Sequence, residues 1–148
     1  MFTIQRAQQG DVESIAPLFD AYRVFYKQET DIPAAKAFLN ERLANNESIL
    51  LIALYEEEVV GFTQLYTTYS SVSLQSFYIL NDLYVSGRFR GKGVGEKLLK
   101  AAKELCEETH FKGLALETAK DNPAQRLYEK LDWKKNTDYF HYFWTSQT

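Results

Sequence analysis

Glycine residues cluster in one short segment of this 148-residue chain, and the same segment carries basic side chains. Four of the seven glycines belong to it: Gly87, Gly91, Gly93 and Gly95. The basic residues between them are Arg88, Arg90 and Lys92. The segment follows an expected strand and opens an expected helix, where free N–H groups and the helix dipole favour an anion. It is therefore a candidate phosphate or pyrophosphate site, and a tight turn with a solvated basic face is the alternative.

The spacing of the glycines narrows the kind of phosphate ligand. No Ser or Thr follows a Gly-Lys pair, as a Walker loop requires, and the order Gly-x-Gly-x-Gly differs from the Rossmann order Gly-x-Gly-x-x-Gly. The segment also comes after three expected antiparallel strands and not after the first strand of a βαβ repeat. Neither of these two nucleotide-binding motifs is present.

Two segments together resemble the GNAT family of N-acetyltransferases. The family signature Arg/Gln-x-x-Gly-x-Gly/Ala is matched by Arg90-Gly91-Lys92-Gly93-Val94-Gly95. The family pattern Asn-x-x-Ala-x-x-Leu-Tyr-x-x-x-Gly-Phe is matched from Asn122 to Trp133, except that Asp132 stands for Gly and Trp133 for Phe. Asp tolerates a left-handed backbone better than most residues, so the end of the helix can survive that change. The segment around Asp82 is most similar to polyamine, thialysine and Hpa2-type acetyltransferases.

The resemblance implies an acetyl-CoA-dependent enzyme. No metal site is expected, because in the sequence His110 and His141 lack partners at ligand spacing. The resemblance also implies that backbone amides of the glycine segment hold the pyrophosphate of coenzyme A, and that the end of the preceding strand bonds the pantetheine arm. The cofactor-binding residues expected on this basis are Leu83, Tyr84, Val85, Arg90, Gly91, Lys92, Gly93, Val94, Gly95, Asn122, Ala124 and Tyr128. Transfer of the acetyl group is expected to be direct, without an acyl-enzyme.

Two residues are the candidates for catalysis. Tyr128 occupies the position of the family's usual general acid, and a phenol with a pKa near 10 can protonate a leaving thiolate. An alkylamine arrives protonated at neutral pH, so a group must bind it and take its proton. Asp82 is the candidate for this role, directly or through water, and Glu117 is a weaker candidate base. A packed aromatic for Tyr128 and a structural carboxylate for Asp82 are the alternatives.

The acceptor expected from the resemblance is the primary amine of a small molecule, polyamine-like or amino-acid-like. A protein lysine acceptor and a non-catalytic CoA-binding regulatory domain are the alternatives. The aromatic side chains of Tyr22, Phe25 and Tyr26 are expected in the core, with one or two of them able to wall the acceptor pocket. The aromatic run at 139–144 makes a homodimer through the C-terminal strands an expectation.

Hydrophobic periodicity sets out the elements that must position these residues. Strands are expected at 2–6, 48–55, 59–68, 74–85, 113–118 and beyond 133, and helices in the regions 15–26, 33–43, 94–105 and 122–131. Pro17 suggests that the first helix starts late or bends. In a strand, Asp82 and Tyr84 point to the same side. The expected fold is a single α/β domain, residues 1–148, with a mostly antiparallel mixed sheet, one parallel pair across the helix after residue 94, and helices on both faces.

Composition excludes several classes of protein. Hydrophobic residues make up 45% and charged residues 25%, as in globular proteins. The net charge of -3 disfavours nucleic acid and anionic membranes as partners. A single cysteine, Cys106, cannot form an internal disulfide, and no apolar run suits a signal peptide or a membrane span. A cytoplasmic location is expected.

Overall fold

The computed structural model describes residues 1–147 of the chain. These residues belong to two compact units, Met1–Glu117 and Thr118–Thr148. The first unit carries a five-stranded sheet and the helices α1, α2 and α3, and the second carries the short helix α4. Among residues 1–147, no helix combines the length and the apolar character needed to cross a membrane.

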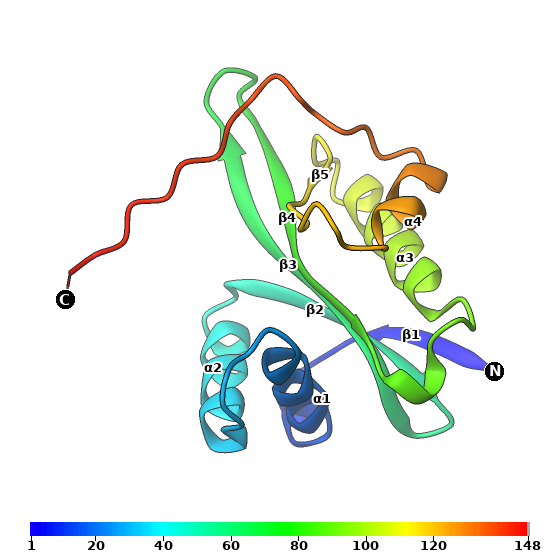
Figure 1. Ribbon diagram of the computed structural model, residues 1–148. Helices are drawn as coiled ribbons and strands as arrows, with labels where there is room; N and C mark the ends of the chain where they lie inside the picture. Colours follow the sequence, from blue (N-terminus) through cyan, green and yellow to red (C-terminus); the bar gives the residue numbers. More distant parts are fainter. Residues whose placement is uncertain (148) are drawn as a thin grey trace. The chain divides into compact units, whose positions relative to one another are not determined.

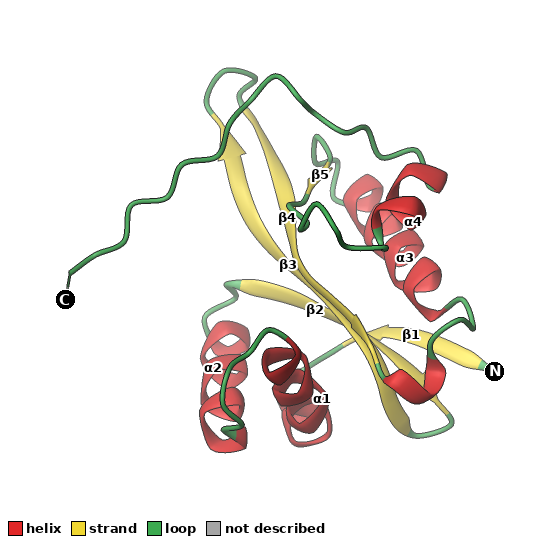
Figure 2. Ribbon diagram, in the orientation of Figure 1, coloured by secondary structure: helices red, strands yellow, loops and turns green. Residues whose placement is uncertain are grey.

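The sheet is a meander with one strand added in parallel (Figure 2). Its strands lie in the order β1-β2-β3-β4-β5, with neighbouring pairs antiparallel from β1 to β4 and parallel between β4 and β5. Their bounds are β1 Phe2–Arg6, β2 Ser48–Tyr55, β3 Glu58–Ser70, β4 Gln75–Val85 and β5 Leu114–Ala115. The mixed sheet and its parallel pair confirm the predicted α/β fold class.

Helices cover both faces of this sheet (Figure 1). On one face lie α1, Val12–Phe25, and α2, Ile32–Ala44, and on the other lies α3, Val94–Glu108. Successive residues of β3 point to opposite faces of the sheet and contact different helices. Phe62 contacts Phe19 of α1 at 5.6 Å between ring centroids, whereas a Cβ on the preceding Gly61 would meet Val94 and Leu98 of α3. The predicted arrangement of helices is thus confirmed.

Two local signals shape the first pair of helices. Asp31 caps α2, since its carboxylate accepts a hydrogen bond from the Ala34 N–H at 3.0 Å, and Pro33 occupies the first turn. Pro17, by contrast, lies inside α1, which begins at Val12. The predicted late start is therefore wrong. One backbone hydrogen bond is lost at Pro17, but burial of Ile15 on the same helix offsets that loss.

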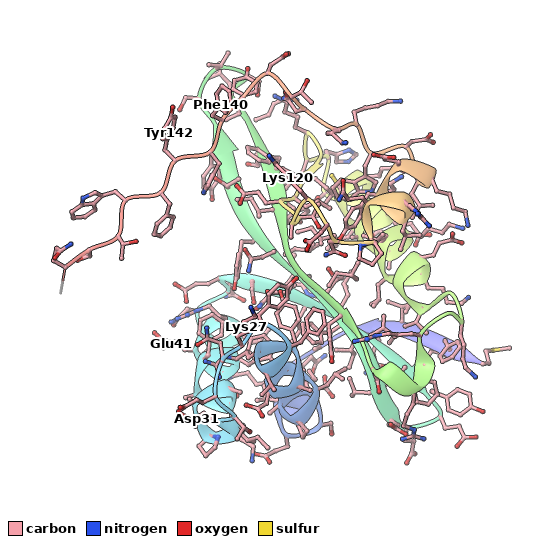
Figure 3. The ribbon with its side chains drawn as sticks, viewed as in Figure 1. Lys27, Asp31, Glu41, Lys120, Phe140 and Tyr142 are labelled. Atoms are coloured by element: carbon pink, nitrogen blue, oxygen red, sulfur yellow. The ribbon has the colours of Figure 1, made fainter. Side chains whose placement is uncertain are left out.

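The C-terminal part has less regular structure than its sequence predicts. The predicted strand at 113–118 is reduced to Leu114–Ala115, and the expected strands beyond Trp133 are absent from the described residues 133–147. The aromatic side chains there are exposed, Phe140 to 89% and Tyr142 to 89% (Figure 3). Aromatic residues favour strands only where a neighbouring strand receives their hydrogen bonds, and this segment has no such neighbour.

Candidate active site

A β-bulge in β4 sets which side chains face α1. Gln64 of β3 is opposite Asp82, whereas the next residue of β3, Leu65, is opposite Leu80, so Asn81 is the extra residue. Beyond the bulge, Asp82 and Tyr84 both face α1, which confirms that they point the same way. Before it, Leu80 faces α3 with Leu65. The bulge therefore places one carboxylate on the face of β4 that also carries Ile79 and Phe77.

The Asp82 carboxylate is fixed by three donors. The Tyr22 hydroxyl of α1 donates to Oδ1 at 2.8 Å, the Gln64 amide donates to Oδ2 at 2.8 Å, and the Asn81 amide donates to Oδ1 at 3.1 Å. Asp82 is 7% exposed. Burying a carboxylate is costly unless it is hydrogen-bonded, and these donors offset that cost. The result is a buried negative charge with a fixed orientation.

Aromatic rings surround this carboxylate on the α1 side. Tyr22 contacts Phe62 and Tyr84, each at 5.5 Å between centroids, and Tyr26 at 5.2 Å. The predicted core position of Tyr22, Phe25 and Tyr26 is wrong for two of them, because Phe25 is 60% exposed and Tyr26, which follows the last residue of α1, is 50% exposed. They lie at the C-terminal end of α1, where the helix runs past the packed region. They form a wall beside Asp82 with one side in solvent.

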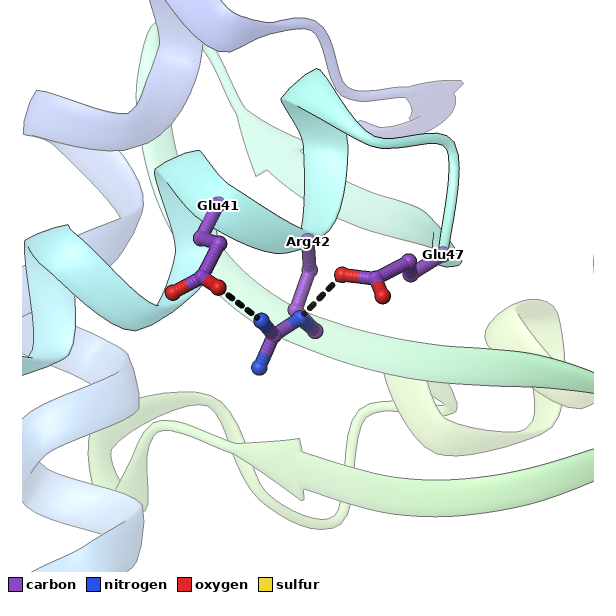
Figure 4. A network of polar contacts seen from close by, with 3 residues as sticks. All are labelled: Glu41, Arg42 and Glu47. Atoms are coloured by element: carbon purple, nitrogen blue, oxygen red, sulfur yellow. Dashed lines mark hydrogen bonds and ion pairs between the residues drawn. The ribbon is translucent and has the colours of Figure 1, made fainter.

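A second phenol, Tyr66, shares this face two positions along β3 from Gln64. Burial raises the pKa of Tyr66 to about 12, with a further contribution from the Asp82 charge and an opposing one from Arg42. Arg42 lowers the pKa of Tyr66 only to a limited extent, because its guanidinium forms ion pairs with Glu41 at 3.0 Å and with Glu47 at 2.9 Å (Figure 4). Tyr66 is consequently a neutral phenol at physiological pH.

The edge of β4 away from β3 carries backbone groups that can bind an extended ligand. The Ser86 N–H donates to the Val60 carbonyl at 2.8 Å. In an antiparallel pair, the backbone N–H and C=O groups of successive residues point alternately toward and away from the partner strand, so those of Leu83 and Val85 point away from β3. Tyr84 instead directs its backbone toward β3 and its ring toward α1. The strand β5 pairs only with Tyr78 and Ile79, so within Met1–Glu117 no strand pairs with this edge at Leu83 and Val85.

Arg90 connects the glycine segment to the aromatic wall. Its Nε donates to the Val85 carbonyl at 3.0 Å. Its guanidinium lies over the Tyr84 ring at 5.2 Å and over the Phe25 ring at 5.9 Å. Such cation–π contacts attract a cation to a ring face. The predicted cofactor residue Arg90 thus lies between the end of β4 and α1.

The geometry of the glycine segment fits a pyrophosphate. Gly91 and Gly93 have φ of +76° and +81°, a left-handed region that favours glycine, and an added Cβ would meet nothing within 4 Å at either. The segment passes into α3 at Val94, and Lys97 donates the helix's first backbone bond, to the Gly93 carbonyl at 3.1 Å. The amides of Val94 and Gly95 precede that bond and are directed out of the helix start, where an anion is favoured. Lys92 and Arg90 add positive charge.

The other predicted motif forms a turn and a helix in the second unit. Asn122 Oδ1 accepts from the Ala124 N–H at 2.9 Å and starts the turn into α4, Gln125–Lys130, which carries Tyr128. Trp133 N–H then bonds the Tyr128 carbonyl at 3.0 Å, and Asp132 N–H bonds the Glu129 carbonyl at 3.2 Å. These two bonds form a Schellman motif, with Asp132 in the left-handed position at φ +69°. The helix end therefore survives the replacement of Gly by Asp.

Sequence reasoning missed two residues of the site, Tyr22 as a donor and Gln64. Each had a signal. Gln64 is the only amide within an apolar and aromatic strand, and a polar residue buried there needs a partner. On the α1–α2 loop, Asp31 serves as a helix cap. Within residues 1–147, no group of three or more His, Cys, Asp or Glu side chains is placed to hold a metal.

Comparisons with known proteins agree with this geometry. The model of the acetyltransferase (GNAT) family matches residues 13–133. An uncharacterized N-acetyltransferase of Bacillus subtilis (strain 168), YhfO, is 47% identical over 140 residues, covering 94% of each chain. A probable acetyltransferase of Haemophilus influenzae is 32% identical over 137 residues, covering 84% of this chain and 94% of that protein. The crystal structure of a probable acetyltransferase has a TM-score of 0.92 with 35% identity, covering 99% of each chain. This chain is thus an N-acetyltransferase of the GNAT family, whose members use acetyl-CoA.

Proposed function

We propose that this enzyme transfers the acetyl group of acetyl-CoA directly to a primary amine of a small molecule, polyamine-like or amino-acid-like. The observation that supports the acceptor class is the buried Asp82 carboxylate with its aromatic surroundings. An alkylammonium is attracted both to a carboxylate and to ring faces. A flat, open surface would instead suit the side chain of a protein acceptor.

The cofactor side of the proposal uses the glycine segment and the edge of β4. Backbone amides at the start of α3 bind the pyrophosphate, and the outward-facing groups of Leu83 and Val85 bond the pantetheine arm. Arg90 holds the end of β4 against α1 through the Val85 carbonyl. Asn122 and Ala124 shape the turn that presents Tyr128. When bound, acetyl-CoA supplies the acetyl group as a thioester.

Two side chains move protons in this scheme. Asp82 binds the acceptor ammonium and takes its proton, directly or through water, so that the nitrogen lone pair can attack the acetyl carbonyl carbon. The new bond is N–C and the broken bond is C–S. Tyr128 gives its phenolic proton to the leaving sulfur and recovers one from solvent. The nitrogen loses two protons in all, the first to Asp82 before the attack and the second to solvent as the tetrahedral intermediate collapses. Sulfur gains one proton, so each turnover releases one proton to solvent.

Thiol release from acetyl-CoA across a panel of amines tests the proposal, with polyamines, lysine analogues, aminoglycosides, aromatic amines and a basic peptide as acceptors. We expect a small primary amine to gain one acetyl group by mass. Asp82→Asn and Tyr128→Phe should each lower turnover by about 100-fold, the typical size of an acid–base contribution. Asp138→Asn, at an exposed position, is the matched control. Unchanged turnover in Tyr128→Phe would refute its role as the acid.

We also propose that the enzyme is a homodimer that uses the aromatic segment 139–144. Tyr139, Phe143 and Trp144 are 79–81% exposed, and exposed apolar surface of this kind marks interaction sites. Mass measurement in solution tests this proposal. A monomer at all concentrations would rule it out, and a dimer that dissociates on Phe143→Ser would support it.

A further inference from the structure

Gln64 carries a buried oxygen atom that has no hydrogen-bond donor among the described residues. Its side chain is fully buried, at 0% exposure, and its Oε1 is the atom concerned. Buried polar atoms are paired in the great majority of cases, and a lone one at an enzyme site calls for an explanation. The same amide contacts Asp82 through its nitrogen at 2.8 Å. The unpaired oxygen therefore lies beside the candidate catalytic carboxylate.

The orientation of this amide is dictated by its neighbour. An ionised carboxylate only accepts hydrogen bonds, so Nε2 and not Oε1 must face Asp82 Oδ2. On Asp82, Oδ1 accepts from both Tyr22 and Asn81, whereas Oδ2 accepts from Gln64 alone. Each carboxylate oxygen can accept about two bonds. The remaining capacity of Asp82 thus lies on Oδ2, next to the unpaired oxygen of Gln64.

The surroundings favour a cation with several N–H groups. Two acceptors, Asp82 Oδ2 and Gln64 Oε1, are adjacent, and Tyr66 on the same face is a phenol kept neutral by burial. The Arg42 guanidinium, whose charge acts on Tyr66, is flanked by the carboxylates of Glu41 and Glu47, so these three side chains together carry a net negative charge (Figure 4). Asn81 is exposed and makes the longest of the three bonds to Asp82, so displacement of its side chain is the proposed route by which the ligand reaches the carboxylate.

We propose that Gln64 is a binding residue for the acceptor: its Oε1 accepts a hydrogen bond from the ammonium group of a primary amine that is paired with Asp82 Oδ2. This inference rests on the proposed function, because it assigns the acceptor end of that site. It makes two demands on the ligand. The group must carry a positive charge for Asp82, and it must have a second N–H for Gln64. An alcohol meets neither demand, and a quaternary ammonium has no N–H.

Ligand-observed NMR titration of the full chain, saturated with coenzyme A so that no turnover occurs, tests these demands. The probes are n-butylamine, 1-butanol and butyltrimethylammonium. We expect n-butylamine to bind at least about tenfold more tightly than either of the others, the size expected for a charge-assisted hydrogen bond. Equal binding of n-butylamine and butyltrimethylammonium would overturn the proposal, since charge alone would then account for recognition.

Variants separate a direct contact from an effect through Asp82. Gln64→Met keeps the side-chain length and removes both polar atoms, and it should weaken n-butylamine about tenfold. Gln75→Met, at an exposed position of the same strand as Asp82, is the matched control and should bind normally. The decisive variant is Gln64→Met in an Asp82→Asn background. Further weakening there indicates direct contact, and no further change would reduce Gln64 to positioning Asp82 and overturn the proposal.

A second variant covers the case in which Gln64→Met fails to fold. Gln64→Glu, when protonated beside Asp82, retains both a donor and an acceptor oxygen, so n-butylamine should still bind. Loss of binding in a folded Gln64→Glu protein would overturn the proposal. These binding measurements do not require acetyl transfer, so they test the role of Gln64 separately from the proposed reaction. Binding of n-butylamine without acetyl transfer would count against the proposed function alone, and transfer with unchanged binding in Gln64→Met would count against this inference alone.

Discussion

Gly61 of β3 packs closely against the start of α3, and the variant Gly61→Ala tests how strongly the packing of the sheet affects that helix start. A Cβ at this position would lie 3.1 Å from Val94 Cγ1, 3.2 Å from the Tyr84 carbonyl oxygen and 3.3 Å from Leu98 Cδ1. Ordinary contacts at such an atom are 3.4 Å or longer. The Val94 methyl can shift, but the Tyr84 oxygen belongs to the backbone of β4, opposite Phe62.

The expected magnitude follows from these contacts. Overpacking a tight site costs about 1–3 kcal/mol, and burying one methyl group returns about 0.8 kcal/mol. Gly10→Ala is the matched control, because a Cβ there meets nothing within 4 Å, so the change in the unfolded chain is similar in both variants. Relative to this control, we expect Gly61→Ala to lose about 1 kcal/mol of unfolding free energy, or roughly 2–4 °C in Tm.

The same displacement should reach the glycine segment, because Val94 is the first residue of α3. Moving its backbone shifts the amides proposed to hold the pyrophosphate, and we expect coenzyme A to bind about threefold more weakly, roughly 0.6 kcal/mol. Calorimetric unfolding and calorimetric titration with coenzyme A measure the two effects. A Gly61→Ala protein that matches Gly10→Ala in both Tm and Kd would refute the reasoning, and Val94→Ala combined with Gly61→Ala should recover part of each loss.

Three further predictions concern buried polar groups. Hydrogen bonds from Thr30 and from a backbone N–H hold the pKa of Asp20 below its usual value. The Asp20 carboxylate therefore stabilises the fold above its pKa in the unfolded chain, and this stabilisation is lost as pH falls through its pKa in the folded protein. Asp20→Ala should cost about 2–4 kcal/mol of unfolding free energy at pH 7, and the Tm of the variant should fall less steeply at acid pH. Asp82→Asn should lower the pKa of Tyr66 from about 12 while leaving it above 10, because burial is the larger cause, as NMR of labelled tyrosine would show; an unchanged value would contradict the proximity of the two groups. Ser48 Oγ is buried without a hydrogen-bond partner among the described residues, so Ser48→Ala should raise stability by about 1 kcal/mol in thermal unfolding, and a lower Tm would indicate a bound water.

Local sequence signals were sufficient for the parts of the site that depend on neighbouring residues. The glycine segment needed only its spacing and its place between a strand and a helix, and the structure gives Gly91 and Gly93 the positive φ that such a turn requires. The tolerance of Asp for that same region predicted how α4 ends at Asp132. Alternation along a strand was enough to place Asp82 and Tyr84 on one side.

Contacts between distant residues could not be read in the same way. Tyr22 and Asp82 are separated by 60 positions, and nothing in either local pattern states that a phenol of α1 reaches a carboxylate of β4. The prediction of strands in the aromatic segment 139–144 was wrong because local propensity was used without a known partner strand. The β-propensity of the segment was real, but a strand requires a partner edge, and propensity alone does not supply one.

The bulge at Asn81 determines which β4 side chains face the candidate site. Strict alternation would put Tyr78, Leu80, Asp82 and Tyr84 on one face of β4. The extra residue divides them, so that Leu80 packs beside Leu65 on the α3 side while Asp82 reaches Tyr22 and Gln64 on the α1 side. A continuous strand would have had to place the carboxylate beneath α3 or the leucine in the proposed acceptor site. The polar pair Asn81-Asp82 in an apolar strand is the sequence signal of this break, because Asn and Asp are poor strand formers. One inserted residue therefore allows β4 to contribute to the core on one face and to the proposed chemistry on the other.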